Sequence, residues 1–161
     1  MKRIIAFLFV FVASLTGILI TYLAGKCPSW VTPIHLWLFC MISGGFGGCV
    51  YCLRGVYLNA CVHKRWDPDW QPWYYIRPFV SMICGAASYL FLRAGLLVLD
   101  STQKQGASDL GFLSLAFIAG MNVDKFIAKI EDIAQATWGI EKSRAANDES
   151  KPDTHSRATN V

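Results

Sequence analysis

Apolar runs about as long as a bilayer is thick constrain this chain more than any other feature. Residues 4–25 contain no charged side chain, and residues 34–58 and 79–99 contain one each, Arg54 and Arg93. A helix needs about 20 apolar residues to cross a hydrocarbon core about 30 Å thick. Only 16% of the 161 residues are charged, against roughly 25% in a typical soluble domain. The sequence therefore predicts an all-α membrane protein.

A fourth apolar run, residues 107–123, is shorter and leads directly into a charged segment. In residues 123–134, apolar side chains recur at helical spacing opposite charged ones such as Asp124 and Lys129. One continuous helix could cross the membrane and emerge amphipathic, or a short inserted hairpin could end where Asn122 caps a separate surface helix. We prefer the crossing, with a transmembrane domain over 1–121 and a cytoplasmic amphipathic helix over 122–140. Residues 141–161 hold too little apolar surface to fold, so we expect disorder there.

The distribution of basic residues predicts the topology. Loops rich in Lys and Arg stay in the cytoplasm. On one side lie Lys2, Arg3, Lys64, Arg65, Arg77 and most basic residues of the tail, whereas only Lys26 and Lys104 lie on the other. We therefore expect about four crossings of the membrane, the fourth one short, with both termini in the cytoplasm.

The segment 63–78 is expected to be a cytoplasmic loop at the membrane surface. Its large aromatic side chains suit the headgroup level, and we expect them to act as anchors there: Trp66, Trp70, Trp73, Tyr74 and Tyr75. Pro78 is expected in the first turn of the third span, where its missing donor would be unsatisfied in any case. The expected surface for a cytoplasmic partner protein combines the polar edge of this loop with one helix face: Lys64, Arg65, Asp67, Asp69, Phe126 and Ile130.

Small residues mark one face of the second and third spans. Gly44-x-x-x-Gly48 lies in the second span, and Gly85 and Ala86 lie in the third. Glycine at this spacing removes side chains from one helix face and lets another backbone approach closely. Such faces serve either packing within one chain or contact between copies in a homo-oligomer, and the sequence leaves both open.

Arg93 is the charged residue that lies deepest in an apolar run. An arginine at the centre of a span costs about 2.5–3.5 kcal/mol on insertion scales, so it usually faces protein or water. The side chain either extends outward to the interface, because the span ends a turn or two later, or forms a buried pair or a pore-lining ring.

The sequence predicts no enzyme, cofactor or metal site. His35, His63 and His155 are scattered over different segments of the chain. The pair Cys49-x-x-Cys52 has the spacing of redox and zinc motifs, but it lies in an apolar span without further ligands nearby. A formal charge of +4 is too small to favour nucleic acid as the primary partner.

Three segments carry a resemblance to known proteins: 75–79 (Tyr-Ile-Arg-Pro-Phe), 92–97 (Leu-Arg-Ala-Gly-Leu-Leu) and 117–121 (Phe-Ile-Ala-Gly-Met). This pattern resembles small multi-span proteins of the bacterial inner membrane that accompany retrons and other phage-defence operons, where they act as toxic effectors. The resemblance implies a self-associating effector that perturbs the membrane when a cytoplasmic partner triggers it. The alternatives are an accessory subunit of a larger membrane complex and a small channel.

Overall fold

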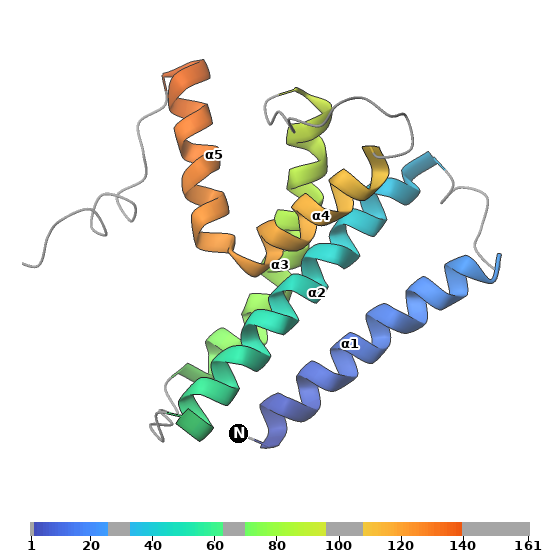
Figure 1. Cartoon of the computed structure of the whole chain (residues 1–161), viewed down its shortest axis with the longest axis vertical. Coiled ribbons are helices and arrows are strands. Elements are labelled where there is room, and N and C mark those ends of the chain that lie inside the picture. The colour runs from blue at the N-terminus through green and yellow to red at the C-terminus, as the bar shows by residue number, and fades with distance from the viewer. Residues whose placement is uncertain (1, 26–32, 63–69, 96–107, 140–161) are drawn as a thin grey trace, which may run out of the picture. The chain divides into compact units, whose positions relative to one another are not determined.

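The computed structural model describes residues 2–25, 33–62, 70–95 and 108–139, and helices are the only regular secondary structure among them. In chain order the elements are α1 (Lys2–Leu23), α2 (His35–Tyr57) with a π-helical extension η2 (Leu58–Val62), α3 (Gln71–Arg93), α4 (Ser108–Met121) and α5 (Val123–Trp138) (Figure 1). The expected all-α class is confirmed. The partner-surface residues Lys64, Arg65, Asp67 and Asp69, together with the tail 141–161, lie outside the described residues.

Three helices are long and apolar enough to cross a membrane: α1, α2 with its extension, and α3. The number rises to four if α4 and α5 are counted as one broken span. The chain divides into two compact units, Met1–Val123 and Asp124–Val161.

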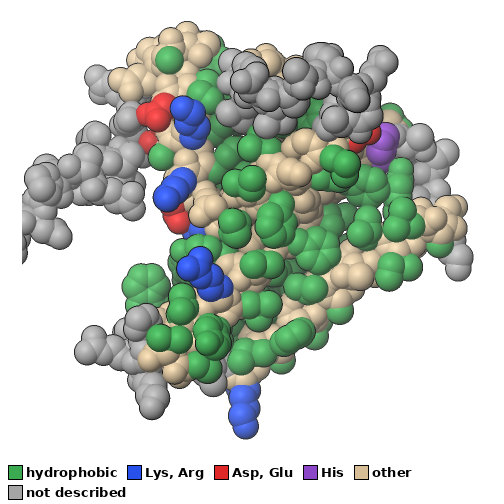
Figure 2. Space-filling model, viewed as in Figure 1, with side chains coloured by type: hydrophobic (Ala, Val, Ile, Leu, Met, Phe, Trp, Pro, Cys, Tyr) green, Lys and Arg blue, Asp and Glu red, His purple; other side chains and the backbone are tan. Residues whose placement is uncertain are grey.

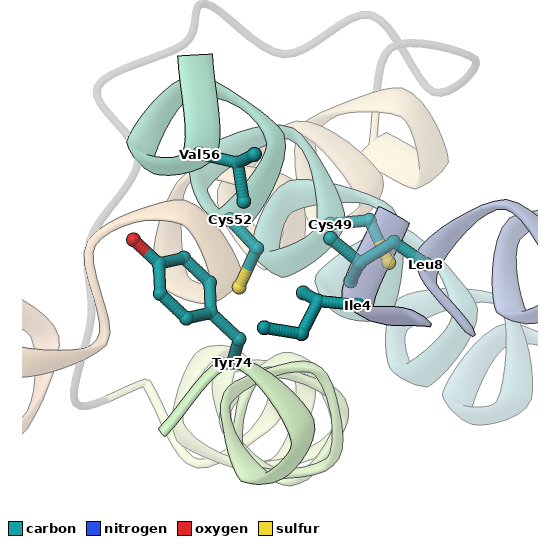
Figure 3. Close-up of a cluster of buried hydrophobic side chains, with 6 residues drawn as sticks. All are labelled: Ile4, Leu8, Cys49, Cys52, Val56 and Tyr74. Carbon is teal, nitrogen blue, oxygen red and sulfur yellow. The ribbon is translucent and has the colours of Figure 1, made fainter. Parts of the chain in front are cut away.

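Within the first unit, α2 is the central helix and packs against α1, α3 and α4. At the end of α2 that leads into η2, buried apolar side chains fill the space between three helices (Figure 3). This cluster, which we call the side-chain core, consists of Ile4, Leu8, Cys49, Cys52, Val56 and Tyr74. Its members come from α1, α2 and α3, so it ties the N-terminal helix to the other two.

The outward sides of these helices are apolar. Figure 2 shows hydrophobic side chains over the visible sides of α1 and α2, whereas charged side chains gather over α5. Phe9 and Val10 on α1 are 62% and 70% exposed, and Ile83 on α3 is 68% exposed. Apolar surface of this extent is unusual for a soluble monomer and suits contact with lipid.

The third helix differs from the expected span of 79–99. It begins at Gln71 and ends at Arg93, so Pro78 lies inside the helix and not in its first turn. Pro72 occupies the first turn instead, where a proline needs no backbone donor. Gly48 of α2 faces the next turn of α3, because a Cβ atom at Gly48 would lie only 2.5 Å from the Cβ atom of Ser81.

The preferred continuous fourth helix is also wrong, because the structure interrupts it at Asn122. Helix α4 ends at Met121 and α5 begins at Val123, and the Asn122 amide still donates to the carbonyl of Ile118 at 2.9 Å. Two helices therefore replace one. The crossing of the membrane by this segment stays a prediction.

Candidate functional site

Small residues from α2, α3 and α4 let these three helices approach one another closely. We call this set the glycine–serine junction, and its members are Ser43, Gly44, Gly47, Gly48, Ser81, Gly85 and Gly120. Glycine permits such an approach because it has no Cβ atom to keep backbones apart.

Gly44 is the centre of this junction. A Cβ atom at Gly44 would lie 2.8 Å from the Cα atom of Gly85 on α3. A Cβ atom at Gly120 of α4 would lie 2.7 Å from the Cα atom of Gly44. Three backbones thus meet at one residue of α2, and the atoms in the way belong to rigid main chain and cannot rotate aside.

Two serines hold α4 in this position. The Ser43 hydroxyl on α2 donates to the carbonyl of Leu113 at 2.8 Å. The Ser81 hydroxyl on α3 donates to the carbonyl of Gly120 at 2.8 Å, and Ser81 is fully buried. A carbonyl in the last turn of a helix has no partner within the helix, so Ser81 satisfies a group that would otherwise be buried without a hydrogen bond.

These contacts fix where α4 ends along its neighbours. Helix α4 lies antiparallel to α3, with Phe112 against Tyr89 at a ring-centroid distance of 5.5 Å and Gly120 against Ser81. Ser81 is the eleventh of the 23 residues of α3. Gly47, which faces the carbonyl of Phe117, is the thirteenth of the 28 residues from His35 to Val62. Helix α4 therefore follows one half of α2 and α3 and stops at their midpoints (Figure 1).

The sequence-predicted small residues lie inside this arrangement. Gly44, Gly48 and Gly85 face other helices of the same chain, and Ala86 is buried on α3 next to Gly85. Of the two expected uses of these faces, the structure therefore contains packing within one chain. The contribution of α4 to this packing was not predicted, although Ala116 and Gly120 have the small-x-x-x-small spacing that predicts close packing.

Arg93 is the last residue of α3 and its side chain is exposed. Its Nη1 atom donates to the hydroxyl oxygen of Tyr89 at 3.2 Å, and its guanidinium lies 5.8 Å from the centroid of that ring. The side chain is thus not buried within the chain, and extension to the interface and a pore-lining ring between copies both stay predictions. No acidic partner for Arg93 is found in the part of the chain that the structure describes.

Arg77, which we expected in a surface loop, is a buried arginine instead. It is 5% exposed in the second turn of α3. Its guanidinium lies 4.9 Å from the ring centroid of Tyr51 and 5.1 Å from that of Trp73, so the charge packs against two neighbouring aromatic rings. The misplaced start of the third helix explains the error, because a helix from Gln71 carries Arg77 into the bundle.

The expected row of headgroup anchors is divided as well. Trp70 is 60% exposed at the start of α3, as an interfacial anchor would be. Tyr74 is 4% exposed and belongs to the side-chain core, where its hydroxyl accepts a hydrogen bond from Asn59 at 3.2 Å. Tyr74 is therefore a core residue, and its expected role as a headgroup anchor is wrong.

In the described residues, the helices contact one another through close packing and hydrogen bonds more than through reactive groups. Five cysteines in this part of the chain form no disulfide bond: Cys40, Cys49, Cys52, Cys61 and Cys84. No group of three or more His, Cys, Asp or Glu side chains among the residues described could hold a metal ion. No protein-family model, curated protein or solved structure matches this chain.

Proposed function

We propose that this chain is a non-enzymatic, multi-pass protein of a bacterial inner membrane. In this proposal it is a self-associating effector that perturbs the bilayer when a cytoplasmic partner triggers it, as in defence against phage. The apolar outward sides of α1, α2 and α3 support the membrane placement. The basic residues Lys2 and Arg3 support a cytoplasmic N-terminus, and the basic residues of the tail support a cytoplasmic C-terminus.

The observation that carries the proposal is the end of α4 at the midpoints of α2 and α3. A 14-residue helix is about 21 Å long, which is too short for a hydrocarbon core of about 30 Å. With α2 and α3 spanning the bilayer, α4 fills its outer half and ends near the midplane. Displacing a helix that fills only one half of the membrane would open the bundle there, because only that half loses its packing.

The contacts of α4 suit an element that can move. Backbone packing at Gly44 and Gly120 is lost at once when the helices separate by one methyl group. Two serine hydroxyls, on Ser43 and Ser81, supply the hydrogen bonds that the structure shows from the side chains of α2 and α3 to α4. In membrane proteins such bonds are worth about 0.6 kcal/mol on average. A partner that binds the segment after α4 would therefore need only modest binding energy to displace it.

A cross-link between α3 and α4 tests whether α4 moves. The test chain carries Tyr89→Cys and Phe112→Cys, whose native rings lie 5.5 Å apart. The matched control joins α1 to α3 through Phe7→Cys and Tyr75→Cys, whose native rings lie 5.0 Å apart. Each chain is expressed in bacteria alone and with its neighbouring genes, and membrane potential and dye entry are followed after induction or phage infection. We expect the α3–α4 cross-link to abolish leakage and the α1–α3 cross-link to leave it. Intact membranes under every trigger with the unmodified chain would refute the effector proposal.

An accessory subunit of a larger membrane complex is the second candidate. The observation that favours it is that Gly44, Gly48 and Gly85 already contact other helices of the same chain, so those faces are not available for self-association. In that case the chain copurifies with other membrane proteins encoded nearby and leaves the membrane potential unchanged. A neighbouring reverse-transcriptase gene would favour the effector, and a transport operon would favour the subunit.

A further inference from the structure

Charged residues begin where α4 ends. Val123 is 2% exposed and belongs to the same compact unit as α1–α4, and Asp124 and Lys125 follow it directly. A helix rises about 1.5 Å per residue, so Lys125 lies about 3 Å and Lys129 about 9 Å from Val123 along the axis of α5. Half of a hydrocarbon core is about 15 Å thick. If α4 ends near the midplane, both lysines start at hydrocarbon depth in whichever direction α5 runs.

Such positions are costly when they face lipid. Each lysine at the centre of a bilayer costs about 2.5–3.5 kcal/mol on insertion scales, so charged residues there face protein or water. Lys125 and Lys129 are both exposed in the described residues. The flexible stem of a lysine shortens the distance to the interface, but Lys125 starts about 12 Å from it.

The charged residues share one side of α5. Lys125, Lys129 and Asp132 follow each other at helical spacing on the side opposite Val123 and Ile130. We call this side the polar stripe, and it comprises Asp124, Lys125, Ala128, Lys129, Glu131, Asp132 and Gln135. It carries two basic and three acidic residues, so both signs of charge occur within a few turns.

We propose that the polar stripe of α5 is a contact between copies of this chain, formed within the membrane. This inference rests on the membrane placement and self-association proposed above. A second copy is the occupant that the charges favour, because the same stripe supplies both the lysines and the carboxylates that it needs. In a two-fold contact, Lys129 of one copy meets Asp132 of the other, and the reverse pair forms by symmetry. The contact also provides a surface for self-association, which the faces at Gly44 and Gly85 do not provide.

Photo-cross-linking of the full chain in bacterial inner membranes tests this contact. Benzoylphenylalanine replaces Ala128, a small residue of the polar stripe, so every charge is retained. In the matched control it replaces Ile127, which lies at the same depth on the apolar side and is 44% exposed. Two differently tagged copies are coexpressed and irradiated. We expect an adduct carrying both tags from position 128 and at least five-fold less from position 127. Adducts with lipid alone, or with another protein alone, would overturn the proposal.

A charge exchange shows whether the polar stripe acts through its charges. With the probe at position 128, Lys129→Glu should lower the adduct at least five-fold, and Lys129→Glu with Asp132→Lys should restore it. No loss in the single variant, at equal chain abundance in the membrane, contradicts the charge pairing. Membrane potential is recorded in parallel. Adducts without leakage would keep the contact and reject the effector, whereas leakage without adducts would reject the contact alone.

Discussion

The helices of the first unit meet in two regions, and the residues at these two contacts differ in size. In the glycine–serine junction, backbones touch at Gly44 and the gaps are too small for a methyl group. In the side-chain core, Leu8 and Tyr74 fill the space between helices with large groups (Figure 3). The buried charge of Arg77 lies close to this second region, against the rings of Tyr51 and Trp73.

This difference explains how α4 stops halfway along α2 and α3. Large side chains keep α1, α2 and α3 apart at one end, and small residues allow α4 to join α2 and α3 along the remaining half. Close backbone packing depends on every atom of the contact, because dispersion falls steeply with distance. A core of large side chains has more ways to adjust. We therefore expect the junction to be the less tolerant of the two regions.

The largest effect is expected for Gly120→Ala. The new methyl group would overlap the main chain of Gly44, whose Cα atom would lie only 2.7 Å away. Overpacking of this kind costs about 1–3 kcal/mol, and we expect the upper end because neither backbone can rotate away. The free energy of unfolding in mixed micelles, followed by tryptophan fluorescence during titration with a denaturing detergent, measures the loss.

Gly17→Ala on α1 is the matched control for this substitution. Its Cβ atom would meet nothing within 4 Å, and alanine is favoured over glycine inside a helix by about 0.5–1 kcal/mol. Stability should therefore stay the same or rise. Equal losses in the two variants would show that the close contact at Gly44 does not exist.

Next in size is Arg77→Gln in the region near the side-chain core. The substitution removes a desolvated cation from the faces of Tyr51 and Trp73, an interaction worth about 2 kcal/mol. We expect a loss of that size in the same detergent titration. Arg54→Gln, at an exposed arginine of α2, should change stability by less than about 0.5 kcal/mol. A loss at Arg77 no larger than at Arg54 would contradict the buried cation–π arrangement.

The sequence predicted the parts of this fold that depend on local pattern. The all-α class and the small-residue faces follow from run length and from spacing, as at Gly44 and Gly48. The start of α3 did not, because Pro72 and Pro78 both fit a first turn and only tertiary packing chooses between them. The end of α4 could not be predicted from local pattern either. It depends on which neighbours Leu113 and Gly120 find, and that information is not local to α4.

A smaller effect is expected for Ser81→Ala, which removes one hydrogen bond to α4 without adding volume. The carbonyl of Gly120 then loses its donor, at a cost of about 1 kcal/mol. Ser88→Ala is the control, since the buried Ser88 hydroxyl bonds to Gly85 of its own helix at 2.7 Å. Hydrogen exchange should show faster exchange of α4 amides in the Ser81 variant only. Unchanged exchange of α4 would mean that glycine packing alone holds the helix.

The smallest effect on stability is expected for Arg93→Leu. The exposed guanidinium contacts Tyr89 within its own helix, so its loss should change the unfolding free energy by less than about 0.5 kcal/mol. Leakage separates the two arrangements that the sequence left open. Because the side chain points outward, we expect the Arg93→Leu variant to depolarise membranes as the unmodified chain does, at equal abundance. Loss of leakage with normal insertion would instead show that Arg93 acts in the assembled protein, as a buried pair or a pore-lining charge would.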